Sequence, residues 1–188
     1  SLDSIRYNIN RKQKNLKFFE FDKAYSLEEK EYKESSKIGI YITGLKQEEH
    51  FVNKPENVSF FDVINITNKV LNIARISDFE TKPKADSKTL DMCVEIISNG
   101  VVLGEIGMVK KEILKTFEIS QDVYHAEIDW PNLIMNFDKE FKFSEIPKFP
   151  QVQRDLSLVM NKDVKYNDVI SVIYLNKNKI LKKVSLYD

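Results

Sequence analysis

The sequence predicts an α+β fold, in which a mostly antiparallel sheet is accompanied by segregated helices. Three observations lead to this prediction. Asn99-Gly100 separates two apolar runs, and this dipeptide favours the type I′ turn of a β-hairpin. Apolar residues recur at helical spacing near the start of the chain and again in 59–76. A strand–helix–strand pattern follows residue 149, so a second, smaller unit is expected there.

The first 44 residues predict a helix followed by two strands. Leu2, Ile5 and Ile9 lie on one helical stripe. The run 16–27 is rich in aromatic residues and predicts a strand. The run 37–44 alternates apolar and small residues, ends in glycine and predicts a second strand.

Polar segments and one longer helix follow from composition and spacing. Residues 28–36 are highly charged and predict a solvated loop. Residues 78–88 predict a polar connector that leads to the hairpin. Between these segments, 59–76 predicts a helix with Ser59 as its N-cap. Its apolar stripe consists of Val63, Ile66, Val70 and Ile73.

The central hairpin is followed by two more elements. The segment 110–119 predicts a short helix, and 121–134 predicts a strand that ends at Pro131. The glycines near the hairpin do not precede a phosphate-binding helix of a β-α-β unit. They are interpreted as turn and sheet-bend residues: Gly100, Gly104 and Gly107.

A boundary is expected near residue 144, where Pro147 and Pro150 lie three positions apart. Proline is excluded from helix interiors and from central strands, so this stretch predicts a connection between domains. The segment 145–188 has eight basic and five acidic residues, a surplus that suits an anionic partner. Its predicted elements are a strand at 155–160, a helix at 166–176 and a strand at 183–188.

Composition limits the classes of function. The chain has 188 residues, of which 42% are hydrophobic and 31% charged, as in ordinary globular proteins. Its 29 basic and 29 acidic residues cancel, so any attraction to nucleic acid or to an anionic membrane must be local. Cys93 is the only cysteine, which suits a reducing cytoplasm. No apolar run reaches the length of a bilayer span, and no secretory signal opens the chain. Because the chain begins at Ser1 with a helical pattern, we expect a piece of a longer protein.

No catalytic or metal-binding constellation emerges from the sequence. His50 and His125 have neither cysteines nor carboxylates at metal-ligand spacing, so surface or strand histidines are expected. Cys93 lies in an apolar strand without a base partner, which favours a buried structural thiol over a nucleophile. Glu127 and Asp129 alternate on one strand face, and a solvated face explains them better than acid–base catalysis.

The residues from Phe149 onward resemble the start of the ferredoxin-fold anticodon-binding domain that closes bacterial phenylalanyl-tRNA synthetase beta subunits. The family pattern is Phe-Pro, three residues, Arg-Asp, an apolar strand, an acidic turn, a helix, and a strand ending near Phe-Asp. This chain supplies Phe149, Pro150, Arg154, Asp155, Asp163 and Asp188, with Tyr187 in place of the usual Phe.

The upstream residues resemble the same family in collinear order. SIRYNINRKQKNLKFFEFDKAY is similar to the family's helix-then-strand passage, and SFFDVINITNKVL to its Phe-Phe-Asp helix. GVVLGEIGMVKKEILKTFEI and VYHAEID are similar to its hairpin, helix and following strand. Two departures are Asp22, where the family mostly has Gly, and Lys110-Lys111, which replaces a frequent His-Pro.

The resemblance implies a domain layout and a role. Residues 1–144 would form a class II synthetase catalytic-like domain that lacks catalytic motifs and its own N-terminal part. Residues 145–188 would form the N-terminal half of the ferredoxin-fold domain. The fragment would serve as scaffold and subunit interface in a cytoplasmic heterotetramer with the alpha subunit, which charges the tRNA for phenylalanine. ATP and magnesium would belong to the holoenzyme, with no cofactor, metal ligand or catalytic residue in this fragment.

The expected tRNA contacts lie in the second domain. Lysines bind phosphates and an aromatic ring can stack on a base. Arg154 and Asp155 are interpreted first as structural, with Arg154 reaching either a carboxylate or an RNA phosphate, and Asp155 accepting backbone hydrogen bonds. Tyr187 is expected in the core or, alternatively, stacked on RNA. The residues assigned to tRNA binding are Arg154, Lys182, Lys183 and Tyr187.

Packing within this domain is also predicted from alternation. Leu156, Leu158 and Met160 are expected under the helix, against Val169 and Ile173, and the intervening residues are expected to face outward. A different class of function is kept as the alternative: a stand-alone protein-binding module with a ferredoxin-like appendage. An independent enzyme is the poorest interpretation, since no nucleophile with a base is visible.

Overall fold

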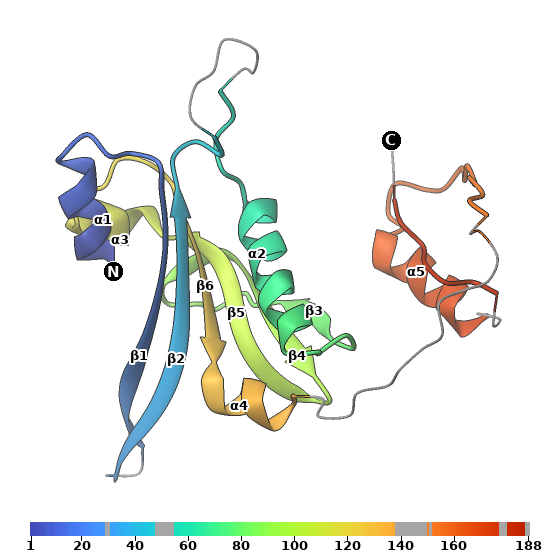
Figure 1. The fold of residues 1–188 in the computed structure, drawn as a ribbon, viewed down its shortest axis with the longest axis horizontal. Helices are drawn as coiled ribbons and strands as arrows, with labels where there is room; N and C mark the ends of the chain where they lie inside the picture. Colours follow the sequence, from blue (N-terminus) through green and yellow to red (C-terminus); the bar gives the residue numbers. More distant parts are fainter. Residues whose placement is uncertain (29–30, 48–54, 138–149, 151, 177–179, 187–188) are drawn as a thin grey trace. The chain divides into compact units, whose positions relative to one another are not determined.

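A computed structural model describes residues 1–28, 31–47, 55–137, 150, 152–176 and 180–186 (Figure 1). The chain divides into two compact units, Ser1–Lys142 and Phe143–Asp188, and each is described by itself. No described helix combines the length and apolar character needed to cross a bilayer.

The first unit is built on a six-stranded antiparallel sheet with the strand order β1-β2-β6-β5-β4-β3. β6 pairs with β2 on one side and with β5 on the other, so it joins two hairpins that are distant in sequence. The strands are β1 (Leu16–Glu28), β2 (Glu31–Thr43), β3 (Glu80–Pro83), β4 (Leu90–Ser98), β5 (Val101–Val109) and β6 (Val123–Asp129). The helices of this unit are α1 (Leu2–Ile9), α2 (Phe60–Ile73), α3 (Lys111–Thr116) and α4 (Trp130–Met135).

The predicted hairpin at Asn99-Gly100 is confirmed. Both residues have positive φ, 51° for Asn99 and 76° for Gly100, as a type I′ turn requires. Gly104 and Val102 of β5 pair with the adjacent residues Ile96 and Ile97 of β4, so Leu103 is one extra residue in β5 and forms a β-bulge. This bulge bends β5 next to Gly104, as the interpretation of that glycine as a sheet-bend residue predicted.

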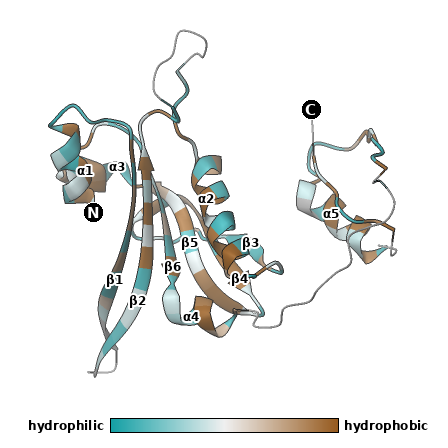
Figure 2. Ribbon diagram, in the orientation of Figure 1, coloured by the Kyte–Doolittle hydropathy of each residue, from teal (hydrophilic) through white to brown (hydrophobic). Residues whose placement is uncertain are grey.

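Helix α2 covers one face of the sheet and forms the larger core with it (Figures 1 and 2). Ser59 is its N-cap, and the carboxylate of Asp62 accepts a hydrogen bond from the Ser59 backbone N–H at 2.7 Å. Of the predicted apolar stripe, Val63 is fully buried and Ile66 and Val70 are partly buried. Ile73 was assigned wrongly, since it is 80% exposed, and Leu71 is the buried residue at that end of the helix. The sheet residues of this core are Ile40, Ile42, Ile96, Leu103, Ile106, Ala126 and Ile128.

A second core lies at one end of the unit, where α1 and α3 pack (Figure 1). Ile5 of α1 is fully buried, and Leu114 of α3 is 3% exposed. Phe18 and Tyr41 pack against this cluster and lie on the sheet face opposite α2. The two short helices therefore cover only one end of that face.

Two of the expected polar segments contain strands, so these predictions were wrong. The charged run expected as a loop at 28–36 is largely the start of β2, which begins at Glu31. These residues lack apolar alternation, but ion pairs across the hairpin, such as Lys23 with Glu34 at 2.6 Å, stabilise them as strands. The expected connector at 78–88 contains β3, whose four residues are all exposed and therefore carry no hydrophobic signal.

The strand was predicted to end at Pro131, but β6 ends at Asp129 and Pro131 lies in the first turn of α4. Proline is tolerated there because the first backbone N–H groups of a helix have no intrahelical partner. The side chain of Asp129 accepts a hydrogen bond from Asn132 N–H at 2.9 Å and caps the helix. The strand β6 thus ends at this capping residue.

The second unit contains helix α5 (Tyr166–Leu175), which confirms the predicted helix. The strand predicted at 155–160 is not formed. Of the strand predicted at 183–188, residues 183–186 are not in a strand, and Tyr187 and Asp188 lie outside the described residues. A strand needs a hydrogen-bonding partner along its edge, and the described residues of this unit supply none. Leu156, predicted to pack under the helix, is 73% exposed, and Leu158 and Met160 are also exposed.

We expect Gly104→Ala to lower the free energy of unfolding by about 1–3 kcal/mol, because its new Cβ would collide with the backbone carbonyl of Glu127. Gly39→Ala is the matched control, since its Cβ would meet only side-chain atoms of Tyr41 and Glu20, at 3.1 Å and more. Urea unfolding monitored by circular dichroism measures both. Equal losses in the two variants would contradict the steric explanation.

Candidate functional site

The sheet face opposite α2 is the main polar surface of the first unit. Register places Glu95, Glu105 and Glu127 directly opposite one another on three neighbouring strands. Gly39 continues this line on β2 and Glu20 on β1. We call Glu20, Glu95, Glu105 and Glu127 the carboxylate row. Adjacent like charges destabilise a sheet, so the row requires neutralising partners.

Lys37 neutralises one end of this surface. Its Nζ lies 3.1 Å from Glu127 and 3.4 Å from Asp129. Ser35 Oγ donates a further hydrogen bond to Asp129 at 3.1 Å. Burial opposes the charge of Lys37, but the hydrogen bonds and charges of the two carboxylates outweigh burial and raise its pKa. The lysine is therefore a fixed cation and not a base.

Lys84 occupies the equivalent place between Glu95 and Glu105. Its Nζ lies 2.8 Å from Glu105 and 3.1 Å from Glu95. The hydrogen bonds to Glu105 and then Glu95 raise the pKa of Lys84 well above its usual range. Cys93, buried as predicted, lies with its Sγ 3.8 Å from Glu105, and burial raises the pKa of its thiol. The thiol is therefore protonated and a poor nucleophile.

His125 is a strand histidine, as expected, and stacks on Tyr41. Their ring centroids are 4.2 Å apart with an interplanar angle of 26°. His125 Nδ1 lies 3.1 Å from the carbonyl oxygen of Ile40, so this nitrogen carries the proton of the neutral ring and donates it. Burial lowers the pKa of His125, more than neighbouring carboxylates raise it, and burial raises the pKa of Tyr41.

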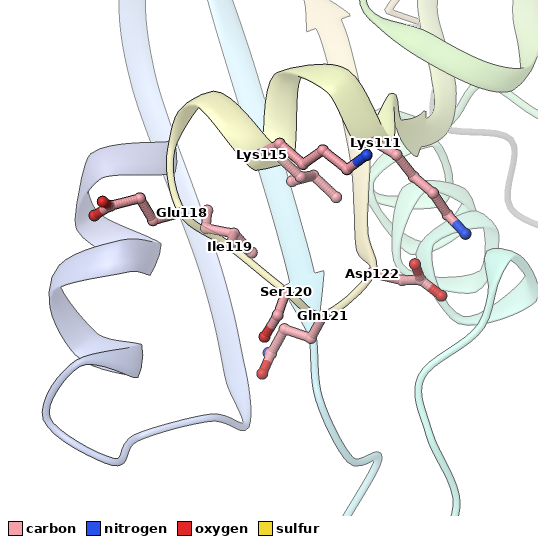
Figure 3. A pocket seen from close by; sticks show the side chains of 8 residues that line it. Lys111, Lys115, Glu118, Ile119, Ser120, Gln121 and Asp122 are labelled. Atoms are coloured by element: carbon pink, nitrogen blue, oxygen red, sulfur yellow. The ribbon is translucent and has the colours of Figure 1, made fainter.

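A hollow of about 430 Å³ lies beside α3 (Figure 3). Lys111 and Lys115 point from the helix, and Asp122 lies below them, directly before β6 (Figure 3). Gln121 donates from Nε2 to the carbonyl of Lys14 and to Thr43 Oγ1, both at 2.7 Å. The lining of the hollow has basic and acidic side chains in equal number, so the hollow has no marked preference for an anion or a cation.

The lysines described above on the polar face of the first unit are structural partners of carboxylates. The cations Lys37 and Lys84 are each neutralised by two carboxylates. The described residues contain no group of three or more His, Cys, Asp or Glu side chains that could hold a metal ion. Glu127 and Asp129 hold Lys37 and cap α4, which gives them structural partners. His50 lies outside the described residues, and the absence of catalysis by this fragment stays a prediction.

The structure places three of the four predicted tRNA-binding residues on the surface of the second unit. Arg154, Lys182 and Lys183 are exposed, and Tyr187 lies outside the described residues. Arg154 forms no hydrogen bond or ion pair with another described residue, and neither does Asp155. Their roles and the assignment to RNA stay predictions.

Helix α5 is the ordered element closest in sequence to these residues. Its N-terminus is capped by Asp168, whose carboxylate accepts a hydrogen bond from the Lys165 backbone N–H at 3.2 Å. Val169 and Ile173 on this helix are partly buried, in agreement with the predicted apolar side of the helix.

Sequence reasoning missed the ion-pair clusters because each joins residues from separate strands. Lys84 lies 21 positions before Glu105, and no spacing rule connects them. A signal does exist for Lys37, since Ser35, Lys37 and Gly39 alternate on one strand face. That alternation identifies a polar face but not the partners across it.

Comparison with known proteins matches the two parts of the chain to two family models. Residues 1–130 match the model described as the phenylalanyl tRNA synthetase beta chain CLM domain. Residues 147–188 match the ferredoxin-fold anticodon binding domain. The first match covers more than half of the chain.

Curated relatives agree over the full chain. The phenylalanine–tRNA ligase beta subunit of Bacteroides thetaiotaomicron is 30% identical over an alignment 201 positions long, which covers 100% of this chain. The corresponding subunit of Bacillus subtilis is 28% identical over an alignment 191 positions long. The chain spans 24% of the length of each of these relatives.

A solved structure supports the fold. Pyrrolysyl-tRNA synthetase from Desulfitobacterium hafniense superposes with a TM-score of 0.54 at 18% identity, covering 71% of this chain and 46% of that chain. At this identity the likeness concerns the fold alone. It confirms the predicted fold class, an α+β fold with an antiparallel sheet.

We expect His125→Phe to flatten the pH dependence of stability between about pH 7 and pH 5. Burial lowers the pKa of the folded imidazole. The unfolded chain therefore binds more protons in this range, and stability falls as the pH falls below about 6.5. Phenylalanine keeps a ring against Tyr41 but cannot titrate. Urea unfolding at several pH values measures the difference, and parallel pH profiles for the two proteins would contradict it.

Proposed function

Since the chain belongs to the family of phenylalanyl-tRNA synthetase beta chains, we propose that it acts as part of a phenylalanine–tRNA ligase beta subunit. In this role residues 1–144 form a catalytic-like scaffold and subunit interface. Residues 145–188 form the first half of the anticodon-binding domain. The observation that carries this proposal is the collinear match of both family models, at 1–130 and 147–188.

The proposed enzyme joins phenylalanine to its tRNA with ATP, and its active site lies in a separate alpha subunit. This chain is proposed to bind that subunit and the tRNA in a cytoplasmic heterotetramer. The polar sheet face supports a scaffold role, because Lys37 and Lys84 are each already neutralised by two carboxylates.

ATP and magnesium are assigned to the alpha subunit and not to these residues. A magnesium–nucleotide complex needs carboxylate oxygens for the metal and free cations for the phosphates. Glu95, Glu105 and Glu127 of the carboxylate row are paired with lysines instead, and the described residues contain no metal-type cluster. The described residues therefore do not fit these ligands.

The second unit is proposed to contact the anticodon end of the tRNA. Lys182 and Lys183 are exposed and adjacent, so both ammonium groups are available to phosphates. Arg154 is also exposed and offers a planar fork that suits a phosphate. Phosphate contacts of this kind position RNA without reading its sequence.

The alternative from another class is a stand-alone protein-binding module with a ferredoxin-like appendage. The exposed apolar side chains Leu156, Leu158 and Met160 of the second unit would suit such a module. Mixing with a phenylalanyl-tRNA synthetase alpha subunit separates the two functions. Co-purification supports the synthetase role, and its absence together with capture of an unrelated protein supports the module.

We expect the double variant Lys182→Glu/Lys183→Glu in the full synthetase to bind its tRNA more weakly and with a shallower salt dependence. Each lost phosphate contact reduces the slope of log affinity against log salt by about 0.7 for a single-stranded segment. Lys111→Glu/Lys115→Glu is the matched control, since it reverses two exposed lysines of the first unit. Filter binding across a salt series measures both, and an unchanged slope with intact folding would contradict the assignment.

We expect the purified chain to show no phenylalanine-dependent exchange between ATP and pyrophosphate. The physical reason is the set of neutralised lysines and the protonated thiol on the polar face. A radiolabelled pyrophosphate assay measures this exchange, with the complete synthetase as the positive control. Exchange above background that persists after removal of contaminating synthetase would contradict the expectation.

A further inference from the structure

Strand β1 presents two lysines and three aromatic rings on the α2 side of the sheet. In the pairing register its residues on this face lie opposite Ile38 and Ile40 of β2, which belong to the α2 side of the sheet. β1 lies at the end of the strand order, so these side chains extend past the helix-covered core. We call Lys17, Phe19, Phe21, Lys23 and Tyr25 the basic-aromatic row.

The rings of this row are mostly uncovered. Phe19 is 81% exposed, Phe21 is 56% exposed and Tyr25 is 66% exposed. Tyr32, on the neighbouring strand, adds another ring that is 83% exposed. Together the four rings expose roughly 500 Å² of largely apolar surface, more than scattered surface residues leave uncovered. Figure 2 shows the hairpin β1–β2 beside the core covered by α2.

The charges of β1 are sorted between its two faces. Lys17 and Lys23 lie on the same face as the rings, whereas Glu20 and Asp22 lie on the opposite face. Lys17 also lines a hollow of about 240 Å³ together with Lys46, Lys69 and Asn65. An anion that follows the row meets lysines at both ends of the Phe19–Phe21 pair.

Two of the three lysines that line the hollow at the end of the row are available to bind an anion. Lys46 is held by Glu56 and lies 3.5 Å from Asp62, so its charge is already neutralised. Lys17 and Lys69 form no ion pair with another described residue. These two lysines can therefore bind phosphates without first breaking a salt bridge.

We propose that the basic-aromatic row binds single-stranded RNA, with its rings stacked on bases and its lysines on phosphates. Exposed aromatic side chains on a sheet face are the platform on which several RNA-binding folds stack bases. Alternate residues of a strand lie about 7 Å apart, so successive rings present separate stacking positions. Phe21 is fixed by an edge-to-face contact with Trp130 at 5.3 Å, which orders one ring before RNA arrives.

This surface is distinct from the proposed anticodon contact, which lies in the other unit of the chain. Its rings offer no fixed pattern of donors and acceptors to base edges, so the binding does not select a sequence. Lys23 Nζ lies 2.6 Å from the Glu34 carboxylate in the free protein. Phosphate must compete with that carboxylate, so Glu34 opposes RNA binding.

The test measures fluorescence anisotropy of a labelled single-stranded RNA of about 12 nucleotides, within the site sizes of known single-strand binders. The chain is used both as it is and with the Lys182→Glu/Lys183→Glu changes, so that the two proposals fail separately. We expect Phe19→Leu to weaken binding about five- to hundredfold, whereas Phe19→Tyr retains it. Tyr7→Leu, at an exposed ring of α1, is the control that leaves affinity unchanged.

Two further variants test the charges. Lys17→Ala/Lys69→Ala is expected to reduce the salt slope by about 0.7 for each lost phosphate contact. Glu34→Gln is expected to tighten binding, because it frees Lys23 and removes a negative charge. Absence of RNA binding by the unaltered chain, or equal affinities for Phe19→Leu and Phe19→Tyr, overturns the proposal. Loss of self-association or of alpha-subunit binding in Phe19→Leu, with RNA affinity unchanged, assigns the row to a protein partner instead.

Discussion

The first unit depends on the insertion of β6 between β2 and β5. This strand brings together the hairpins β1–β2 and β4–β5, which are separated in the sequence by residues 44–89, and its register decides which residues face each side of the sheet. Ala126 and Ile128 point to the α2 side and complete the main core. His125 and Glu127 point to the other side. A shift of one residue would bury the charges and expose the core, so hydrophobic burial fixes the register.

The register of the strands brings like charges together on the polar face, and these charges require neutralising partners. The carboxylate row lies across adjacent strands, where like charges repel. Lys37 and Lys84 relieve this repulsion, each by bridging two carboxylates. The consequence for function is that the face holds structural ion pairs where a phosphate-binding site would need free cations. These ion pairs support the proposed scaffold role of the sheet.

The two units differ in how they are stabilised. The first encloses two cores with fully buried residues such as Ile5, Val63 and Ile128. The second has one described helix, and its apolar residues Leu156 and Leu158 are exposed. A single helix buries too little surface to offset the entropy of ordering a chain of this length. Contacts to a partner, whether RNA or protein, therefore have the most to contribute in the second unit.

Local chemistry in the sequence determined the α+β class and most element positions. The Asn99-Gly100 turn depends on two residues that accept positive φ, and the start of α2 depends on Ser59 and Asp62. Both signals act within four residues, so no tertiary information is needed to read them. Burial of Cys93 and the side of α2 that faces the sheet follow from apolar periodicity in the same way.

Tertiary structure alone decided the features that depend on partners distant in sequence. The charged start of β2 is a strand because β1 lies beside it, and the exposed β3 exists because β4 offers an edge. Lys84 meets Glu105 through folding, not through spacing. The strand predicted at 155–160 is not formed, because alternation cannot supply the neighbouring strand that hydrogen bonding requires. Sequence patterns record what a residue can do locally, whereas pairing across a sheet is fixed only when the whole chain has folded.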